Sequence, residues 1–106
     1  MLNVVQKRQS FEEIVSLLNG FGYERCCVLS DNPIFLGVKE YPVNCIVCKK
    51  DIMKNGYSSL AGFLVDIQVT GIVLVDKQLD CSEEWLQRLI ETGHKVQVFE
   101  LIEAGK

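Results

Sequence analysis

The sequence predicts a single α/β domain in which helices flank a mixed β-sheet. The chain has 106 residues, the size of one domain with one hydrophobic core. Hydrophobic residues make up 48% of it and charged residues 24%, as in an ordinary globular protein. Apolar residues recur with helical spacing in three segments, and short runs rich in Val, Ile and Cys lie between them. The predicted order is helix, strand, strand, strand, helix, strand, helix, strand.

The first predicted helix spans residues 10–19. Ser10 and Glu13 have the spacing of a capping box, in which each side chain accepts a backbone N–H of the other residue. Gly20 supplies the stop signal. The apolar residues recur every three or four positions and form one stripe, which consists of Phe11, Ile14, Val15 and Leu18.

Three strands are predicted after this helix, at residues 25–29, 34–38 and 43–49. Each run is short, apolar and bounded by turn residues. The turn at 40–42 contains a proline, and we expect it to join the second and third strands as a hairpin.

The pattern of apolar residues in the C-terminal half predicts two further helices, each followed by a strand. One helix begins near Ser58 and precedes the strand at 71–75, whose continuous apolar run is typical of a strand with neighbours on both sides. The next helix is capped by Asp80 or Ser82 and precedes the last strand at 96–101. The residues that we expect to be buried in the sheet include Val28, Ile46 and Val73.

Composition and charge exclude several classes of protein. No apolar run reaches the roughly 18 residues that a membrane span needs, and the N-terminal residues do not form a signal peptide. The net charge of −3 lacks the strongly basic character of a nucleic-acid-binding surface. The five cysteines are an odd number, and most lie in apolar runs, as reduced core thiols do. We therefore expect a cytoplasmic protein with reduced cysteines and no membrane contact.

Cys45 and Cys48 have the spacing of some zinc and redox sites. Such pairs lie on turns or at helix starts, whereas this pair lies in a predicted strand, where residues three apart point to opposite faces. The adjacent Cys26 and Cys27 also point apart. Four cysteines on two neighbouring strands could still meet, so a zinc site stays open as an alternative to the expected absence of any cofactor. The single histidine, His94, follows a helix end and favours a capping role.

Three segments spread over the chain form a further pattern. The first is the helix at 11–18 with Gly20-Phe21-Gly22-Tyr23 after it, and the second is Ile46-Val47-Cys48-Lys49-Lys50. The third is the strand at 71–75, followed by a helix and Gly93-His94-Lys95-Val96. Together they resemble the Mrr-like branch of PD-(D/E)xK nuclease domains. The resemblance implies a restriction-endonuclease-like, three-layer fold of order αβββαβαβ, with a metal-site glutamate at Glu12 and the catalytic lysine at Lys49.

The metal-binding part of this pattern is incomplete. The family places an aspartate on the second strand and a Glu or Gln two residues before the lysine. Here the second strand has no acidic residue, and Val47 stands two residues before Lys49. An active site would have to hold Mg²⁺ with Glu12 and with Asp31 or Glu40, which flank that strand. The resemblance therefore predicts a degenerate site that does not cleave DNA.

These observations predict a catalytically inactive binding or regulatory module in a nucleic-acid-processing or defence-related system. We expect a protein partner, with a homodimer as a further expectation, and the net charge does not support binding to nucleic acid. Two alternatives stay open. One is a small acidic immunity or inhibitor protein that binds a toxin or nuclease, and the other is a Mg²⁺-dependent DNA endonuclease with the catalytic residues Glu12, Asp31, Glu40 and Lys49.

Overall fold

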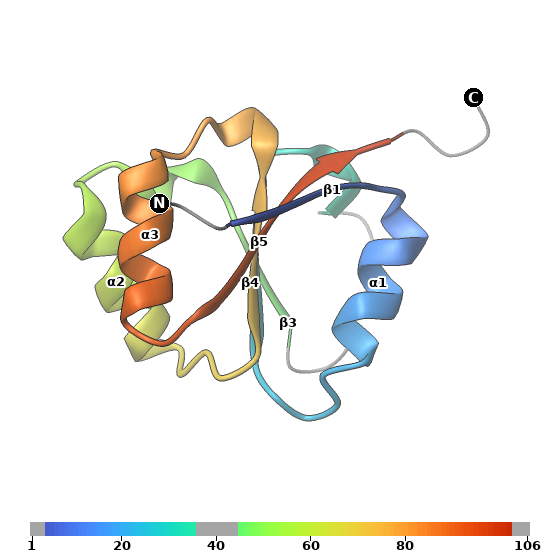
Figure 1. The fold of residues 1–106 in the computed structure, drawn as a ribbon, viewed down its shortest axis with the longest axis horizontal. Coiled ribbons are helices and arrows are strands. Elements are labelled where there is room, and N and C mark those ends of the chain that lie inside the picture. The colour runs from blue at the N-terminus through green and yellow to red at the C-terminus, as the bar shows by residue number, and fades with distance from the viewer. Residues whose placement is uncertain (1–3, 36–44, 103–106) are drawn as a thin grey trace.

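The computed structural model describes residues 4–35 and 45–102. In these residues, five strands form one sheet in the spatial order β1-β5-β4-β2-β3, and all neighbouring strands are parallel (Figure 1). The mixed sheet predicted from the sequence is therefore wrong, and so is the restriction-endonuclease-like fold. The strands are β1 (Val5–Gln9), β2 (Cys26–Leu29), β3 (Cys45–Cys48), β4 (Ile72–Asp76) and β5 (Lys95–Leu101).

Helices cover both faces of this sheet. In Figure 1, α1 lies on one side of the sheet, and α2 and α3 lie together on the other side. In the part of the chain that the structure describes, no helix has the length and apolar character needed to cross a bilayer. The α-helices are α1 (Phe11–Asn19), α2 (Tyr57–Asp66) and α3 (Glu83–Glu91), and the short 3-10 helices are η1 (Pro33–Phe35), η2 (Lys50–Met53) and η3 (Lys77–Leu79).

The edge strand β1 was not predicted from the sequence. Four of its five residues are exposed, so its side chains lack the apolar alternation of a half-buried strand. Only Gln9 is buried, and its side-chain oxygen accepts a hydrogen bond of 2.8 Å from the Nε2 atom of Gln97 on β5. With β1 in place, α1 is the crossover helix of a β1-α1-β2 unit, which requires parallel strands.

The second predicted strand is wrong where the structure describes it. Ile34 and Phe35 belong to the 3-10 helix η1. The side-chain Oδ1 atom of Asn32 accepts the N–H of Ile34 at 3.0 Å, and the backbone carbonyl oxygen of Asn32 accepts the N–H of Phe35 at 3.1 Å. Because Asn32 closes this turn, the chain cannot be extended there. The expected strand beyond Phe35 and the hairpin turn at 40–42 lie outside the described residues.

The core confirms the central position of the strand predicted at 71–75. β4 lies between β2 and β5, and all five of its residues are buried. Val73 and Val75 pack with the cluster under α2 and α3, whereas Ile72 and Leu74 pack with the cluster under α1. The expected burial of Val28 and Val73 is also confirmed, but Ile46 is only half-buried because β3 is at the sheet edge.

The predicted capping box at the start of α1 is present. The Glu13 carboxylate accepts the Ser10 N–H at 2.9 Å, and the Ser10 hydroxyl accepts the Glu13 N–H at 3.2 Å. The bond from the Ser10 N–H lowers the pKa of the Glu13 carboxyl, because it favours the charged form. Glu13 therefore has a structural role at the point where β1 turns into α1.

Candidate functional site

The carboxyl ends of the strands form the edge of the sheet at which parallel α/β domains bind ligands. The chain leaves β2 toward β3 on one side and leaves β4 toward β5 on the other. The segments after β2 and β4 therefore diverge, although these two strands are neighbours. Such a divergence leaves a crevice at the carboxyl edge, which is the usual place of a binding site in this architecture.

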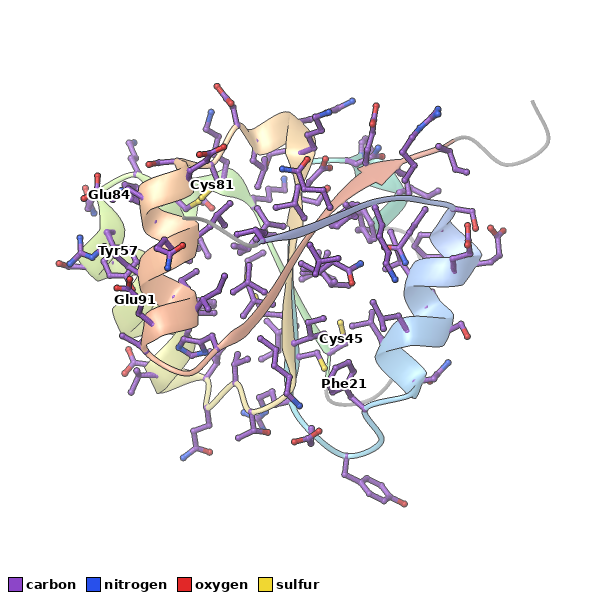
Figure 2. All side chains as sticks on the ribbon, viewed as in Figure 1. Phe21, Cys45, Tyr57, Cys81, Glu84 and Glu91 are labelled. Atoms are coloured by element: carbon purple, nitrogen blue, oxygen red, sulfur yellow. The ribbon has the colours of Figure 1, made fainter. Side chains whose placement is uncertain are left out.

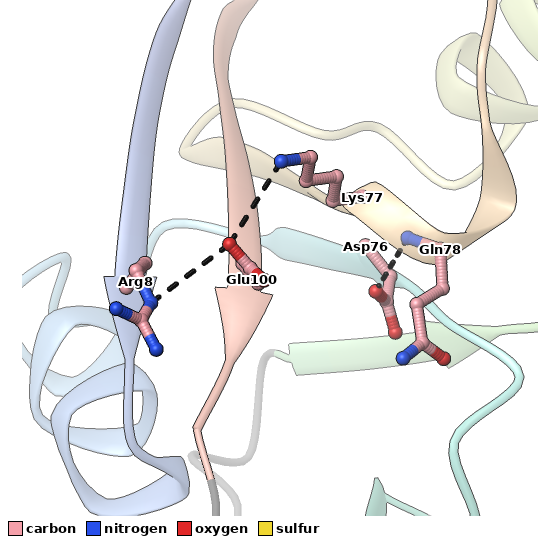
Figure 3. Close-up of polar contacts among 5 residues, drawn as sticks. All are labelled: Arg8, Asp76, Lys77, Gln78 and Glu100. Atoms are coloured by element: carbon pink, nitrogen blue, oxygen red, sulfur yellow. Dashed lines mark hydrogen bonds and ion pairs between the residues drawn. The ribbon is translucent and has the colours of Figure 1, made fainter.

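A buried hydrogen-bond network joins β2 to β4 at this crevice. The Ser30 hydroxyl donates to Oδ2 of Asp76 at 2.6 Å, and the two residues are only 1% and 3% exposed. The other Asp76 oxygen accepts the N–H of Gln78 at 3.0 Å (Figure 3), and the Ser30 hydroxyl accepts the N–H of Asn32 at 3.0 Å. Both carboxylate oxygens of Asp76 are thus occupied by protein donors, so Asp76 holds the two loops together.

A small cavity adjoins this network. Its volume is about 310 Å³, and Asp31 and Lys50 stand on its wall. Oδ1 of Asp31 accepts the backbone N–H of Lys50 at 2.9 Å, which ties the loop after β2 to the start of η2. The lining of this cavity is mostly polar, and the Oδ1 atom of Asp31 already has one hydrogen-bond donor in the Lys50 N–H.

A larger cavity of about 540 Å³ adjoins the small one and shares Lys50 and Leu79 with it. We call it the carboxyl-edge cavity. One wall is η2 with the residue after it, and it contributes Lys50, Asp51, Met53 and Lys54. The other wall runs from the end of η3 into α3, and it contributes Leu79, Asp80, Cys81, Ser82 and Trp85. Figure 2 shows Cys81 beside the start of α3.

The apolar side chains of this cavity come from both walls. Met53 and Leu79 are core residues, and Trp85 is half-buried. The Trp85 ring packs edge-on against Tyr57 with a centroid distance of 6.2 Å, and the Arg88 guanidinium lies 4.0 Å from the Tyr57 ring centroid on α2. These contacts hold the indole in place at the edge of the cavity.

The residues predicted for a nuclease do not form a metal site in the described structure. Glu12 is exposed on the first turn of α1, and Lys49 is exposed at the start of η2. Asp31 contacts the backbone of Lys50, and Glu40 lies outside the described residues. Val47 packs against the cluster under α1. Across residues 4–35 and 45–102, no group of three or more His, Cys, Asp or Glu side chains is arranged to hold a metal ion.

The four cysteines of β2 and β3 form two pairs on opposite faces of the sheet. Cys26 and Cys45 are register partners in the cluster under α1, and Figure 2 shows Cys45 on that side. Cys27 and Cys48 belong to the cluster under α2 and α3, where the Cys27 thiol hydrogen-bonds to Cys48. This bond and burial raise the pKa of the Cys27 thiol, and burial raises the pKa of Cys45 to about 12. The sheet separates the pairs, so the four sulfurs cannot share one zinc ion.

We therefore predict that the purified protein contains no stoichiometric zinc and no disulfide. Burial raises the pKa of the Cys26 and Cys45 thiols. The hydrogen bond between Cys27 and Cys48 raises the pKa of the Cys27 thiol and lowers that of Cys48. Each face of the sheet offers only two of these thiols, fewer than a tetrahedral zinc ion needs. Elemental analysis and intact mass after rapid alkylation of fresh lysate measure the two properties. About one zinc per chain, or a mass showing fewer alkylated thiols than cysteines, would contradict this prediction.

A second charged cluster lies at the ends of β1 and β5. The Oε1 atom of Glu100 forms ion pairs with Nε of Arg8 at 3.9 Å and with Nζ of Lys77 at 3.8 Å (Figure 3). These side chains are largely exposed, and such ion pairs contribute about 0–1 kcal/mol. The cluster is therefore a weaker candidate for a binding site than the cavity beside Trp85.

Sequence reasoning identified none of the carboxyl-edge cavity as a site. The signal available was the position of polar loops directly after two apolar strands, at Lys49–Asp51 and at Asp76–Asp80. Comparison of the chain with family models, curated proteins and solved structures found no match.

Proposed function

We propose that this chain is a small-molecule-binding domain whose site is the carboxyl-edge cavity. The observation that carries the proposal is an open cavity of about 540 Å³ at the carboxyl edge of an all-parallel sheet. Its volume lies within the usual range of ligand pockets, roughly 300–1,000 Å³. Met53, Leu79 and Trp85 give it an apolar surface, and charged residues stand around it.

Binding is favoured over catalysis by the chemistry of the cavity wall. Cys81 is its only thiol, and burial together with the negative charge of Asp80 raises the pKa of that thiol. A protonated thiol is a weak nucleophile at neutral pH. No histidine lines the cavity to act as a base toward Cys81 or Ser82. The residues present can shield an apolar group from water and contact polar groups at the opening.

The proposal keeps the binding role expected from the sequence and changes its target. The expected link with nucleic acid depended on the restriction-endonuclease resemblance, and the parallel sheet removes the fold that this resemblance implied. The endonuclease alternative loses the same support. A protein partner and a homodimer stay predictions that no feature of the cavity addresses.

The site is tested with a neutral apolar dye, N-phenyl-1-naphthylamine, whose emission rises when it leaves water. Trp85 is the only tryptophan of the chain, so its own fluorescence reports on the cavity. We expect saturable binding of the dye, with a parallel change in Trp85 emission. Cys81→Phe should place a ring in the cavity and weaken binding by about tenfold, the equivalent of roughly 1.4 kcal/mol.

Val65→Phe is the matched control, because Val65 is 68% exposed on α2 and does not line the cavity. It adds the same ring to the surface and should leave dye affinity unchanged. Thermal unfolding of each variant checks that the fold is retained. Dye binding that is equal in wild type and in a folded Cys81→Phe variant would refute the proposed site.

A further inference from the structure

The two walls of the carboxyl-edge cavity carry opposite net charge. The η2 wall has two lysines, Lys50 and Lys54, and one aspartate, Asp51. Among the described residues, the wall formed by η3 and α3 has one charged residue in the cavity lining, Asp80. At neutral pH the first wall is therefore net positive by one charge, and the second is net negative by one charge.

These four charges are not neutralised by one another within the described residues. The ion pairs found there within 4.0 Å join Glu100 to Arg8 and to Lys77, and neither involves the cavity. All four side chains are exposed, so they are hydrated when the cavity is open. A ligand in the cavity can reach both walls because the apolar residues that it covers come from both.

The position of Asp80 is fixed by the backbone. Asp80 ends η3 with φ +52° and ψ +45°, in the left-handed region, and its N–H donates to the carbonyl oxygen of Lys77 at 3.1 Å. Asp and Asn adopt this conformation more readily than most residues. The carboxylate of Asp80 is therefore attached at a defined point of its wall.

We propose that the ligand of this cavity is a zwitterion of the α-amino-acid class with a large apolar side chain. The inference rests on the proposed function, because it names the ligand of the same site. The ligand carboxylate faces Lys50 and Lys54, its ammonium group faces Asp80, and its side chain lies between Met53, Leu79 and Trp85. A simple anion would leave Asp80 without a partner, and a simple cation would face the lysines.

Four probes of the same shape separate these charge states. L-phenylalanine is the zwitterion, 3-phenylpropionate lacks the ammonium group, 2-phenylethylamine lacks the carboxylate, and 3-phenylpropionamide is neutral. The phenyl group does not absorb where Trp85 is excited selectively, so each probe is titrated against Trp85 fluorescence. We expect L-phenylalanine to bind more tightly than either singly charged probe by roughly three- to fivefold, the size of one exposed ion pair.

Two charge-removing variants assign each contact to its wall. Asparagine tolerates the backbone conformation of Asp80. Asp80→Asn should therefore lower the affinity for L-phenylalanine to that for 3-phenylpropionate, and it should leave the affinity for 3-phenylpropionate unchanged. Lys54→Met keeps the length of the side chain and should lower the affinity for L-phenylalanine toward that for 2-phenylethylamine. Lys7→Met is the control, because Lys7 lies on β1 and outside the cavity lining, and it should change the affinity for none of the probes.

The proposed function and this inference fail in different ways. If N-phenyl-1-naphthylamine binds in the cavity but the four phenyl probes bind equally or not at all, the zwitterion assignment is overturned and the binding site stands. The same assignment is overturned if 3-phenylpropionate binds as tightly as L-phenylalanine and Asp80→Asn has no effect. If the dye itself does not bind, the proposed function fails.

Discussion

Replacing Val73 with aspartate is expected to unfold the domain. Val73 is fully buried in the central strand β4 and packs in the cluster under α2 and α3. The new carboxylate would have no cation beside it, and burial of an unpaired charge costs several kcal/mol. Because a domain of this size has a stability of about 5–15 kcal/mol, we expect a loss above about 4 kcal/mol and a largely unfolded protein at room temperature. Far-UV circular dichroism and urea denaturation measure this loss.

Val65→Asp provides the matched control for this prediction. It makes the same chemical change on α2, where the valine is 68% exposed. An exposed substitution of this kind changes stability by about 0.5 kcal/mol or less. A Val73→Asp variant that unfolds cooperatively within about 1 kcal/mol of the wild type would show that β4 is not the buried centre of the sheet.

The second large effect is expected from Asp76→Ala. This change removes the acceptor of the Ser30 hydroxyl and of the Gln78 N–H at the junction of β2 and β4. The Ser30 hydroxyl is buried and would lose a charge-assisted hydrogen bond. We expect the free energy of unfolding to fall by about 2–3 kcal/mol, measured by urea denaturation.

A double-mutant cycle with Ser30→Ala isolates this hydrogen bond. Both single variants lose the same hydrogen bond. The loss in free energy of unfolding of the double variant should therefore be smaller than the sum of the two single losses, by about 1 kcal/mol or more. Asp31→Ala is the control at the adjacent position, where the side chain is exposed and, within the described part of the chain, accepts one backbone N–H, that of Lys50. Equal losses from Asp31→Ala and Asp76→Ala, or strict additivity in the cycle, would contradict the network.

The helices and the central strand could be predicted because their patterns are strong and local. The first helix was predicted at 10–19 and is found at Phe11–Asn19, with its capping box in place. The strand predicted at 71–75 is found at Ile72–Asp76, since a continuous apolar run between Gly71 and Asp76 fits a strand with two neighbours. In both cases the residues that decide the structure lie next to one another in the chain.

The direction of the strands could not be predicted because it depended on β1. Val5–Gln9 is a polar edge strand, and its only buried side chain is a glutamine. Without it, α1 was taken as the first element, as in a restriction-endonuclease-like domain. With it, helix α1 lies between two strands, and the chain alternates strands and helices in the way that favours a parallel sheet.

The cavity could not be predicted because its walls are assembled by the strand order. Lys54 and Asp80 lie on segments that follow β3 and β4, and nothing in their local sequence places them at one opening. Trp85 has the helical spacing of a core residue and is partly one, since it packs against Tyr57. Its remaining exposed surface depends on the course of η2, which a local pattern does not specify.

The pairing of β1 with β5 has a consequence for how the domain folds. Gln9 and Gln97 are 88 positions apart, yet their side chains share a buried hydrogen bond. Among residues 4–35 and 45–102, β5 is the only strand that pairs with β1, so β1 cannot join this sheet until β5 has been synthesised and has docked on β4. Closing so long a loop is slow and brings little burial, because β1 is mostly exposed. The strand made first therefore joins the sheet last, and it is also the one whose release costs the native state least.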